Sequence, residues 1–211
     1  MEAFSYEKWP RREAYEFFSG ISDPFYMVTF RQDVTGLYNF TRRNGLSFYY
    51  GMVWACTRAV NKVEAFRLTV RGGEIVRLPG RDPSFTDLKE GAEQFHIVTL
   101  PFDDDPVSFC RMAAWQSREQ ESFIDLRKET DELLYLSCLP WVELTAMSNE
   151  RDLNAPNARD DCIPRIAWGR FREENGRKIL GLSLEVNHRM IDGVHIGRFA
   201  EELTRVIESL Q

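Results

Sequence analysis

One histidine of this sequence ends an apolar strand at the point where the chain turns toward a helix. Residues 180–188 alternate strictly, so one face carries every second side chain: Leu180, Leu182, Leu184, Val186 and His188. Burial lowers the pKa of an imidazole, so we expect His188 to be neutral at pH 7. A neutral, oriented imidazole at a strand end can act as a general base. Asp192 and Gly193 would make the turn into the helix.

Two other roles for this segment compete with catalysis. A lone histidine at the end of an apolar face is more often a satisfied core residue than a catalyst, and periodicity does not separate the two. His188, Asp192 and His195 are also metal-ligand types within eight residues. Their spacing matches no closed metal motif, so we expect no metal site.

Hydrophobic periodicity and turn signals predict the elements that position this histidine. Apolar residues at helical spacing predict helices over residues 9–18, 48–63 and 107–128 and from residue 194 onward. Strands are predicted over 25–30, 66–70, 74–78, 95–100, 134–147 with a break at Pro140, 164–172 and 178–188. The Asn175-Gly176 pair favours a tight hairpin between the last two strands. A single α+β domain over residues 1–211 accounts for this order.

Composition excludes several classes of protein. The net charge is −6, and nucleic-acid or anionic-membrane partners need clustered cations, so neither is expected. No apolar run is long enough for a transmembrane helix, and the first residues carry no secretory signal. The four cysteines form no CxxC pair, which indicates reduced thiols in a cytoplasmic protein.

Several segments resemble the chloramphenicol acetyltransferase family, in the family's order along nearly the whole chain. The segment VNHRMIDGVHIGRF at residues 186–199 is similar to the family's HHxxxDGfHvgRf active-site signature. Further matches are WPRREAYEFF at 9–18, Phe48-Tyr49 with Ala59-Val60-Asn61, Leu139-Pro140-Trp141-Val142, and Asp152-Leu153-Asn154. The acyltransferase cores of the 2-oxo acid dehydrogenase complexes share the signature, including Arg189. Their expected lipoyl domains and linkers do not occur in this sequence.

The resemblance implies an acetyl-CoA-dependent O-acyltransferase with a two-layer α/β sandwich and a large mixed sheet. The acceptor would be chloramphenicol or a related small apolar alcohol, and coenzyme A would be the second partner. The family forms homotrimers with active sites between subunits, and His188 would be the catalytic base. Asp192 would form a salt bridge with Arg11. We expect this pair to be buried, so removing one partner should cost on the order of 3–5 kcal/mol.

This sequence departs from the family at positions that carry polar groups. The family serine that stabilises the oxyanion falls on Ala146 when counted from Pro140. About four extra residues before Asp152 make Ser148 the alternative donor, and Thr145 is a third candidate. Losing one such donor typically costs on the order of 10²–10³ in rate.

The other departures concern the acceptor pocket and the signature. A family threonine falls on Ala167, a pocket tyrosine falls on Phe18, and the first signature histidine is Asn187, which we expect to face away from His188. The acceptor-pocket candidates are Phe18, Phe25 and Phe95. The lost hydroxyls support a second hypothesis from another class: a trimeric scaffold that binds coenzyme A or a small ligand with weak or no turnover.

Overall fold

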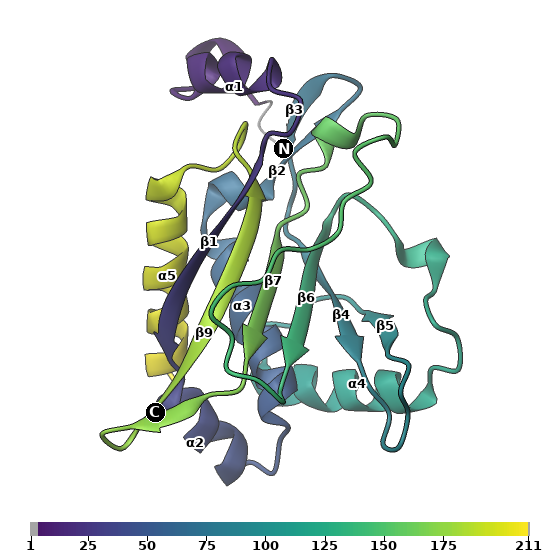
Figure 1. Cartoon of the computed structure of the whole chain (residues 1–211), viewed down its shortest axis with the longest axis vertical. Helices are drawn as coiled ribbons and strands as arrows, with labels where there is room; N and C mark the ends of the chain where they lie inside the picture. Colours follow the sequence, from purple (N-terminus) through teal and green to yellow (C-terminus); the bar gives the residue numbers. More distant parts are fainter. Residues whose placement is uncertain (1–3, 211) are drawn as a thin grey trace.

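A seven-stranded mixed sheet forms the centre of the protein in this computed structural model, which describes residues 4–210 (Figure 1). Its strands are β1 (Phe25–Asp33), β4 (Asp82–Asp87), β5 (His96–Thr99), β6 (Leu133–Leu139), β7 (Arg165–Gly169), β8 (Arg172–Glu174) and β9 (Arg177–Asn187). The strand order is β1-β9-β7-β6-β4-β5, and β8 pairs with β9. The β4–β6 and β6–β7 pairs are parallel, and the others are antiparallel.

Helices cover one face of this sheet (Figure 1). They are α3 (Phe48–Lys62), α4 (Pro106–Glu119) and α5 (Gly193–Glu208), with α2 (Thr35–Arg43) at one end of this layer. The helix α1 (Arg12–Ser19) lies beyond the opposite end of the sheet (Figure 1). Short 3₁₀ turns cover Tyr6–Lys8, Glu64–Arg67, Leu126–Lys128 and Ala158–Asp160, and β2 (Leu68–Arg71) and β3 (Glu74–Arg77) form a separate hairpin. None of the helices described is long and apolar enough to cross a membrane.

The core lies between the helices and the sheet. Leu182 and Leu184 of β9 are almost fully buried and belong to one apolar cluster with Val60 of α3 and Phe199 of α5. Burying side chains of this size stabilises the fold by about 1.5–3 kcal/mol each. This arrangement confirms the predicted α+β class and explains the alternation along β9, because its apolar face is the helix-covered face.

Turn chemistry confirms the predicted hairpin and corrects two other boundaries. Asn175 and Gly176 both have positive φ, 52° and 77°, as a type I′ turn requires. The predicted helix over 107–128 is wrong beyond Glu119. There the side chain of Gln120 donates to the carbonyls of Ile97 and Ser122, and the chain leaves the helix. The strand that starts at Leu133 ends at Leu139 and does not continue to residue 147.

Arg81 is a buried residue that the sequence analysis missed. Its guanidinium is 1% exposed and donates to five backbone carbonyls, those of Phe66, Leu68, Asp131, Leu133 and Cys162. Burial lowers the pKa of Arg81 to about 10. One side chain therefore connects the β2–β3 hairpin with the start of β6 and with the loop before β7.

Candidate active site

The turn from β9 into α5 is stabilised mainly by its own backbone. The amides of Met190 and Ile191 both donate to the carbonyl of Asn187. Asp192 is the N-cap of α5, and its carboxylate accepts from the Gly193 amide at 2.7 Å. His195 completes a capping box, because its Nδ1 accepts from the backbone amide of Asp192 at 3.0 Å.

His188 lies between two aromatic rings in this turn. Phe18 stacks on the imidazole with ring centroids 3.8 Å apart and an interplanar angle of 23°. Tyr26 lies on the imidazole at 4.3 Å. The backbone amide of His188 donates to the carbonyl of Pro24 at 2.7 Å. The ring is therefore held in place by contacts from α1 and β1, and its side chain is 29% exposed.

Burial lowers the pKa of His188 below its ordinary value, and the positive charge of Arg11 lowers it further. The carboxylate of Asp192, 3.8 Å from Nε2, opposes this shift. The net direction favours the neutral imidazole at pH 7. The ring is therefore able to accept a proton.

Arg11 connects both ends of the turn. One guanidinium nitrogen contacts the Asp192 carboxylate at 2.8 Å, and the other donates to the carbonyl of His188 at 2.9 Å. The Arg11 side chain is 13% exposed, but that of Asp192 is 50% exposed. The pair is thus half-buried, and the cost of 3–5 kcal/mol expected for a buried pair is too high. Because water solvates the Asp192 carboxylate, we expect the removal of one partner to cost about 1–2 kcal/mol.

The opposite face of the sheet is covered by an irregular segment, residues 142–161, that crosses β7 and β9 (Figure 1). It passes so close that a Cβ on Gly169 or Gly181 would collide with the backbone of Leu144. Further along, the amide of Met147 donates to the Ser183 hydroxyl at 2.9 Å, and the amide of Asn149 donates to the Glu185 carboxylate at 2.9 Å. The polar face of β9 therefore provides the hydrogen-bond partners of this segment.

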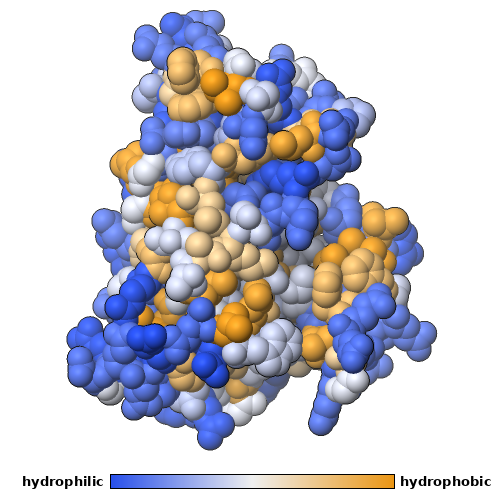
Figure 2. Space-filling model, in the orientation of Figure 1, coloured by the Kyte–Doolittle hydropathy of each residue, from blue (hydrophilic) through white to orange (hydrophobic). Residues whose placement is uncertain are grey.

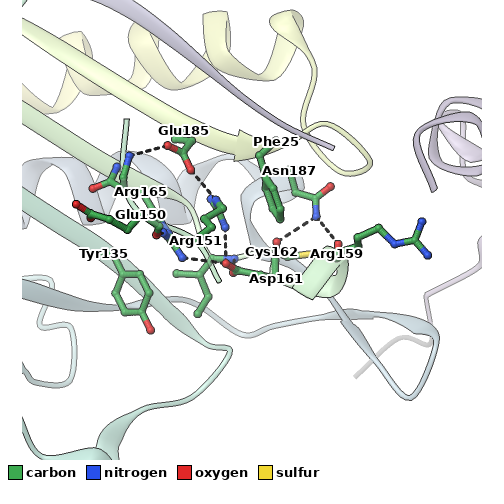
Figure 3. Close-up of polar contacts among 12 residues, drawn as sticks. Phe25, Tyr135, Glu150, Arg151, Arg159, Asp161, Cys162, Arg165, Glu185 and Asn187 are labelled. Carbon is green, nitrogen blue, oxygen red and sulfur yellow. Dashed lines mark hydrogen bonds and ion pairs between the residues drawn. The ribbon is translucent and has the colours of Figure 1, made fainter. Parts of the chain in front are cut away.

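A network of charged residues ties this segment to β9 (Figure 3). Arg151 contacts Glu185 at 2.6 Å and also pairs with Asp161. Arg165 contacts Asp161 at 3.0 Å, and burial lowers the pKa of Arg165. The side chains of Arg151 and Glu185 are 8% and 7% exposed. The guanidinium of Arg151 also covers the ring of Phe25 at 3.8 Å.

Two residues of the signature anchor the end of this segment. Asn187 Nδ2 donates to the carbonyls of Arg159 and Asp161 at 2.8 and 3.0 Å. Arg189 is 6% exposed; it pairs with Asp160 at 2.6 Å and donates to the hydroxyls of Ser19 and Tyr15. These two side chains join the segment to α1 and to the histidine turn.

A cavity of about 1,140 Å³ opens over β4, β6 and β7. Several aromatic side chains line it, among them Phe48, Tyr49, Phe95, Tyr135, Trp141 and Trp168. Of the three predicted pocket phenylalanines, only Phe95 lines it; Phe18 stacks on His188, and Phe25 lies under Arg151. His188 is not part of this lining either.

The predicted oxyanion donors lie near the cavity but outside it. Thr145 and Ser148 are both exposed, and neither contributes to the lining. Ala167 is fully buried in β7, opposite Ser183 of β9. Within residues 4–210, no group of three or more His, Cys, Asp or Glu side chains is arranged to hold a metal ion.

Two solved structures have the same arrangement. A chloramphenicol acetyltransferase superposes with a TM-score of 0.86 at 20% identity, covering 98% of this chain and 99% of the other. A truncated catalytic core of the 2-oxoacid dehydrogenase multienzyme complex from Thermoplasma acidophilum gives 0.67 at 16% identity, with both chains fully covered. These likenesses establish the fold.

The sequence comparisons establish the family. The model of the chloramphenicol acetyltransferase family matches residues 2–204, so this chain belongs to that family. Chloramphenicol acetyltransferase 3 of Escherichia coli is 27% identical over 209 residues, which cover 98% of this chain and 96% of the relative. A chloramphenicol acetyltransferase of Streptomyces acrimycini is 28% identical over 205 residues, covering 95% and 91%. The protein is therefore an acyltransferase of the chloramphenicol acetyltransferase type.

Proposed function

We propose that this enzyme transfers the acetyl group of acetyl-CoA, the cosubstrate of its family, to the hydroxyl of chloramphenicol or a related small apolar alcohol. The observation that carries the proposal is the neutral imidazole of His188, fixed between Phe18 and Tyr26 at the end of β9. The sandwich fixes the ring plane, and Arg11 with Asp192 fixes the backbone that bears it. A general base needs both the free ring nitrogen and the fixed orientation.

The proposed reaction proceeds by direct attack. The His188 imidazole accepts the proton of the acceptor hydroxyl as that oxygen attacks the carbonyl carbon of the thioester. The carbonyl oxygen becomes an oxyanion, and the tetrahedral intermediate then expels the coenzyme A thiolate. The thiolate takes the proton from the imidazolium, which restores the neutral base. Asp192 positions the turn through Arg11 and does not relay the proton.

We infer that the active site forms between subunits of a homotrimer. Phe95 lines the cavity, but His188 does not. A ligand bound in the cavity therefore reaches the imidazole of His188 when the cavity of one copy faces His188 of another copy. Apolar side chains exposed at the cavity support such a contact, including Trp141 at 67% and Phe95 at 45%. Figure 2 shows apolar patches on this face of the molecule.

Acetyl transfer tests the base directly. Thiol release from acetyl-CoA is measured with chloramphenicol and a series of primary alcohols, for the wild type and for His188→Ala. We expect the variant to lose on the order of 10²–10⁴ in kcat. Equal rates in the two proteins with every acceptor would refute the assignment. Coenzyme A binding by calorimetry without His188-dependent product would instead identify a binding scaffold.

Subunit mixing tests the shared site. His188→Ala is co-expressed with Ser137→Trp, which fills the cavity, and each variant alone should be inactive. Mixed trimers would contain cavities without the tryptophan that face intact histidines, and so should recover activity. A trimeric mass in sedimentation together with this recovery is the expected result. A monomer, or mixtures with no recovery, would contradict the shared site.

A further inference from the structure

The chemistry proposed for this enzyme needs a hydrogen-bond donor for the oxyanion. The side chain of Ala146 carries no donor, and the hydroxyls of Thr145 and Ser148 lie outside the lining of the cavity. Asn149 is a few residues further on the same segment, and it does line the cavity. Side-chain amides of asparagine serve as oxyanion donors as well as hydroxyls do.

The backbone at Asn149 is rigidly held. Its amide donates to Glu185 at 2.9 Å, and two residues earlier the amide of Met147 donates to Ser183 at 2.9 Å. Glu185 is in turn fixed by Arg151 at 2.6 Å, and both side chains are almost fully buried. A donor on such a segment is preorganised, so it need not reorient when the negative charge develops.

The side-chain amide of Asn149 is also free. Within residues 4–210 it makes no hydrogen bond to any side chain or backbone group, and only its backbone amide is engaged. The tyrosine hydroxyls along the cavity are engaged: Tyr49 donates to the Thr86 carbonyl, Tyr50 to Asp87 and Tyr135 to Glu129. Partly or fully buried lining groups are engaged as well: the hydroxyls of Thr86 and Ser137 bond to each other at 3.0 Å, Ser84 accepts from Thr99 at 2.8 Å, and Arg165 pairs with Asp161. Ser47, Trp141 and Arg170, which also line the cavity, are exposed.

We propose that Asn149 is the oxyanion donor of this enzyme: its Nδ2–H binds the thioester carbonyl oxygen as that oxygen becomes negatively charged. This proposal rests on the acetyl transfer proposed above. It assigns to a side-chain amide the role that the family resemblance gives to a serine hydroxyl. It also explains why the loss of a hydroxyl at residue 146 is compatible with activity.

The test compares Asn149→Ala and Asn149→Asp with the wild type. Aspartate keeps the shape of asparagine but replaces the donor with an acceptor, and both variants keep the backbone bond to Glu185. We expect kcat to fall on the order of 10²–10³ in both, with KM for acetyl-CoA within about threefold. Thiol release is measured with an alcohol and also with water as acceptor, so that the result does not depend on the choice of acceptor. Asn154→Ala, an exposed asparagine of the same segment outside the cavity lining, is the matched control and should retain wild-type kcat.

Each outcome separates the hypotheses. If His188→Ala is inactive but Asn149→Ala keeps wild-type kcat, the proposal for Asn149 is wrong and the acyltransferase assignment stands. If kcat falls on the order of 10²–10³ in Ser148→Ala or Thr145→Ala while Asn149→Ala keeps wild-type kcat, the oxyanion donor is that hydroxyl and not Asn149. If the wild type and His188→Ala release thiol at the same rate, both proposals fail together. Melting temperatures close to that of the wild type verify that each variant is folded.

Discussion

The histidine turn at residues 188–192 and the segment 142–161 both depend on β9, but they are stabilised in different ways. The turn uses backbone bonds and a helix cap within a few residues, and Arg11 supports it through a pair with the half-exposed Asp192. The segment has no regular ladder, and it is held by buried charged side chains and by glycines that permit close approach. The turn should therefore tolerate single substitutions, whereas the segment should depend on a few residues.

The largest effect is expected at the buried network. Glu185→Ala leaves Arg151 with one carboxylate partner instead of two and leaves the Asn149 amide without an acceptor, so we expect the free energy of unfolding to fall by about 3–5 kcal/mol. Urea denaturation measures this free energy of unfolding. The matched control is Glu143→Ala, which breaks the exposed Arg172 pair and should cost less than about 1 kcal/mol. Similar losses in the two variants would remove the distinction between buried and exposed pairs.

The close approach at Gly181 should rank next. Gly181→Ala places a methyl group against the carbonyl of Leu144, so the segment must shift. We expect about 1–3 kcal/mol of destabilisation and a lower kcat, because Asn149 moves with the segment. Gly197 lies in α5 with open space around it, so Gly197→Ala should stabilise by about 0.5–1 kcal/mol. A neutral Gly181→Ala variant would show that the segment adapts freely.

Arg11→Ala tests the contacts by which Arg11 supports the histidine turn. Losing the bonds to Asp192 and to the His188 carbonyl should cost about 1–2 kcal/mol. The base works only when neutral, so activity falls as pH drops through the pKa of His188. Removing the positive charge of Arg11 raises that pKa, although burial remains the main cause that lowers it and Asp192 opposes it. The acid limb of the kcat profile should therefore move to higher pH, while Arg12→Ala, at an exposed arginine, should leave it in place.

The smallest effect is expected when one of the two aromatic rings that contact the His188 imidazole is removed. Phe18→Ala exposes the His188 ring to water, which relieves part of the desolvation that lowers its pKa. Tyr26, Asp192 and Arg11 still face the ring, so we expect a modest upward shift of the acid limb and a lower kcat. Phe17→Ala, at a neighbouring ring that is 67% exposed, is the control. An acid limb shifted to lower pH in Phe18→Ala would contradict the burial argument.

Local signals predicted much of the fold. Alternation along β9, the Asn175-Gly176 turn and the helical spacing of α5 are properties of consecutive residues, and they were correct. The short strand β8 was merged with β7 in the prediction, and α2 and β4 were missed because their local signals are weak. In α2, Gly36 and polar residues surround one large buried side chain, that of Leu37. In β4, Pro83 and the flanking aspartates are residue types that are rare in strands, so the sequence does not indicate a strand there.

The site was only partly predictable because its parts are distant in sequence. The signature located His188 and Asp192, and the resemblance paired Asp192 with Arg11, which the structure places in contact. Three phenylalanines looked equivalent as pocket residues, yet one stacks on the base, one lies under Arg151 and one lines the cavity. The network of Arg151 and Glu185 gave no signal, because single charged residues in a strand and a loop are ordinarily solvent-exposed.

The aromatic sandwich around His188 also provides a spectroscopic probe. The stacked Phe18 ring at 3.8 Å and the tilted Tyr26 ring at 4.3 Å shield the imidazole protons by their ring currents. Among the three histidines of the chain, His188 should therefore show the most upfield carbon-bound proton resonances. A titration followed on those resonances would report protonation of the base itself, with no substrate present.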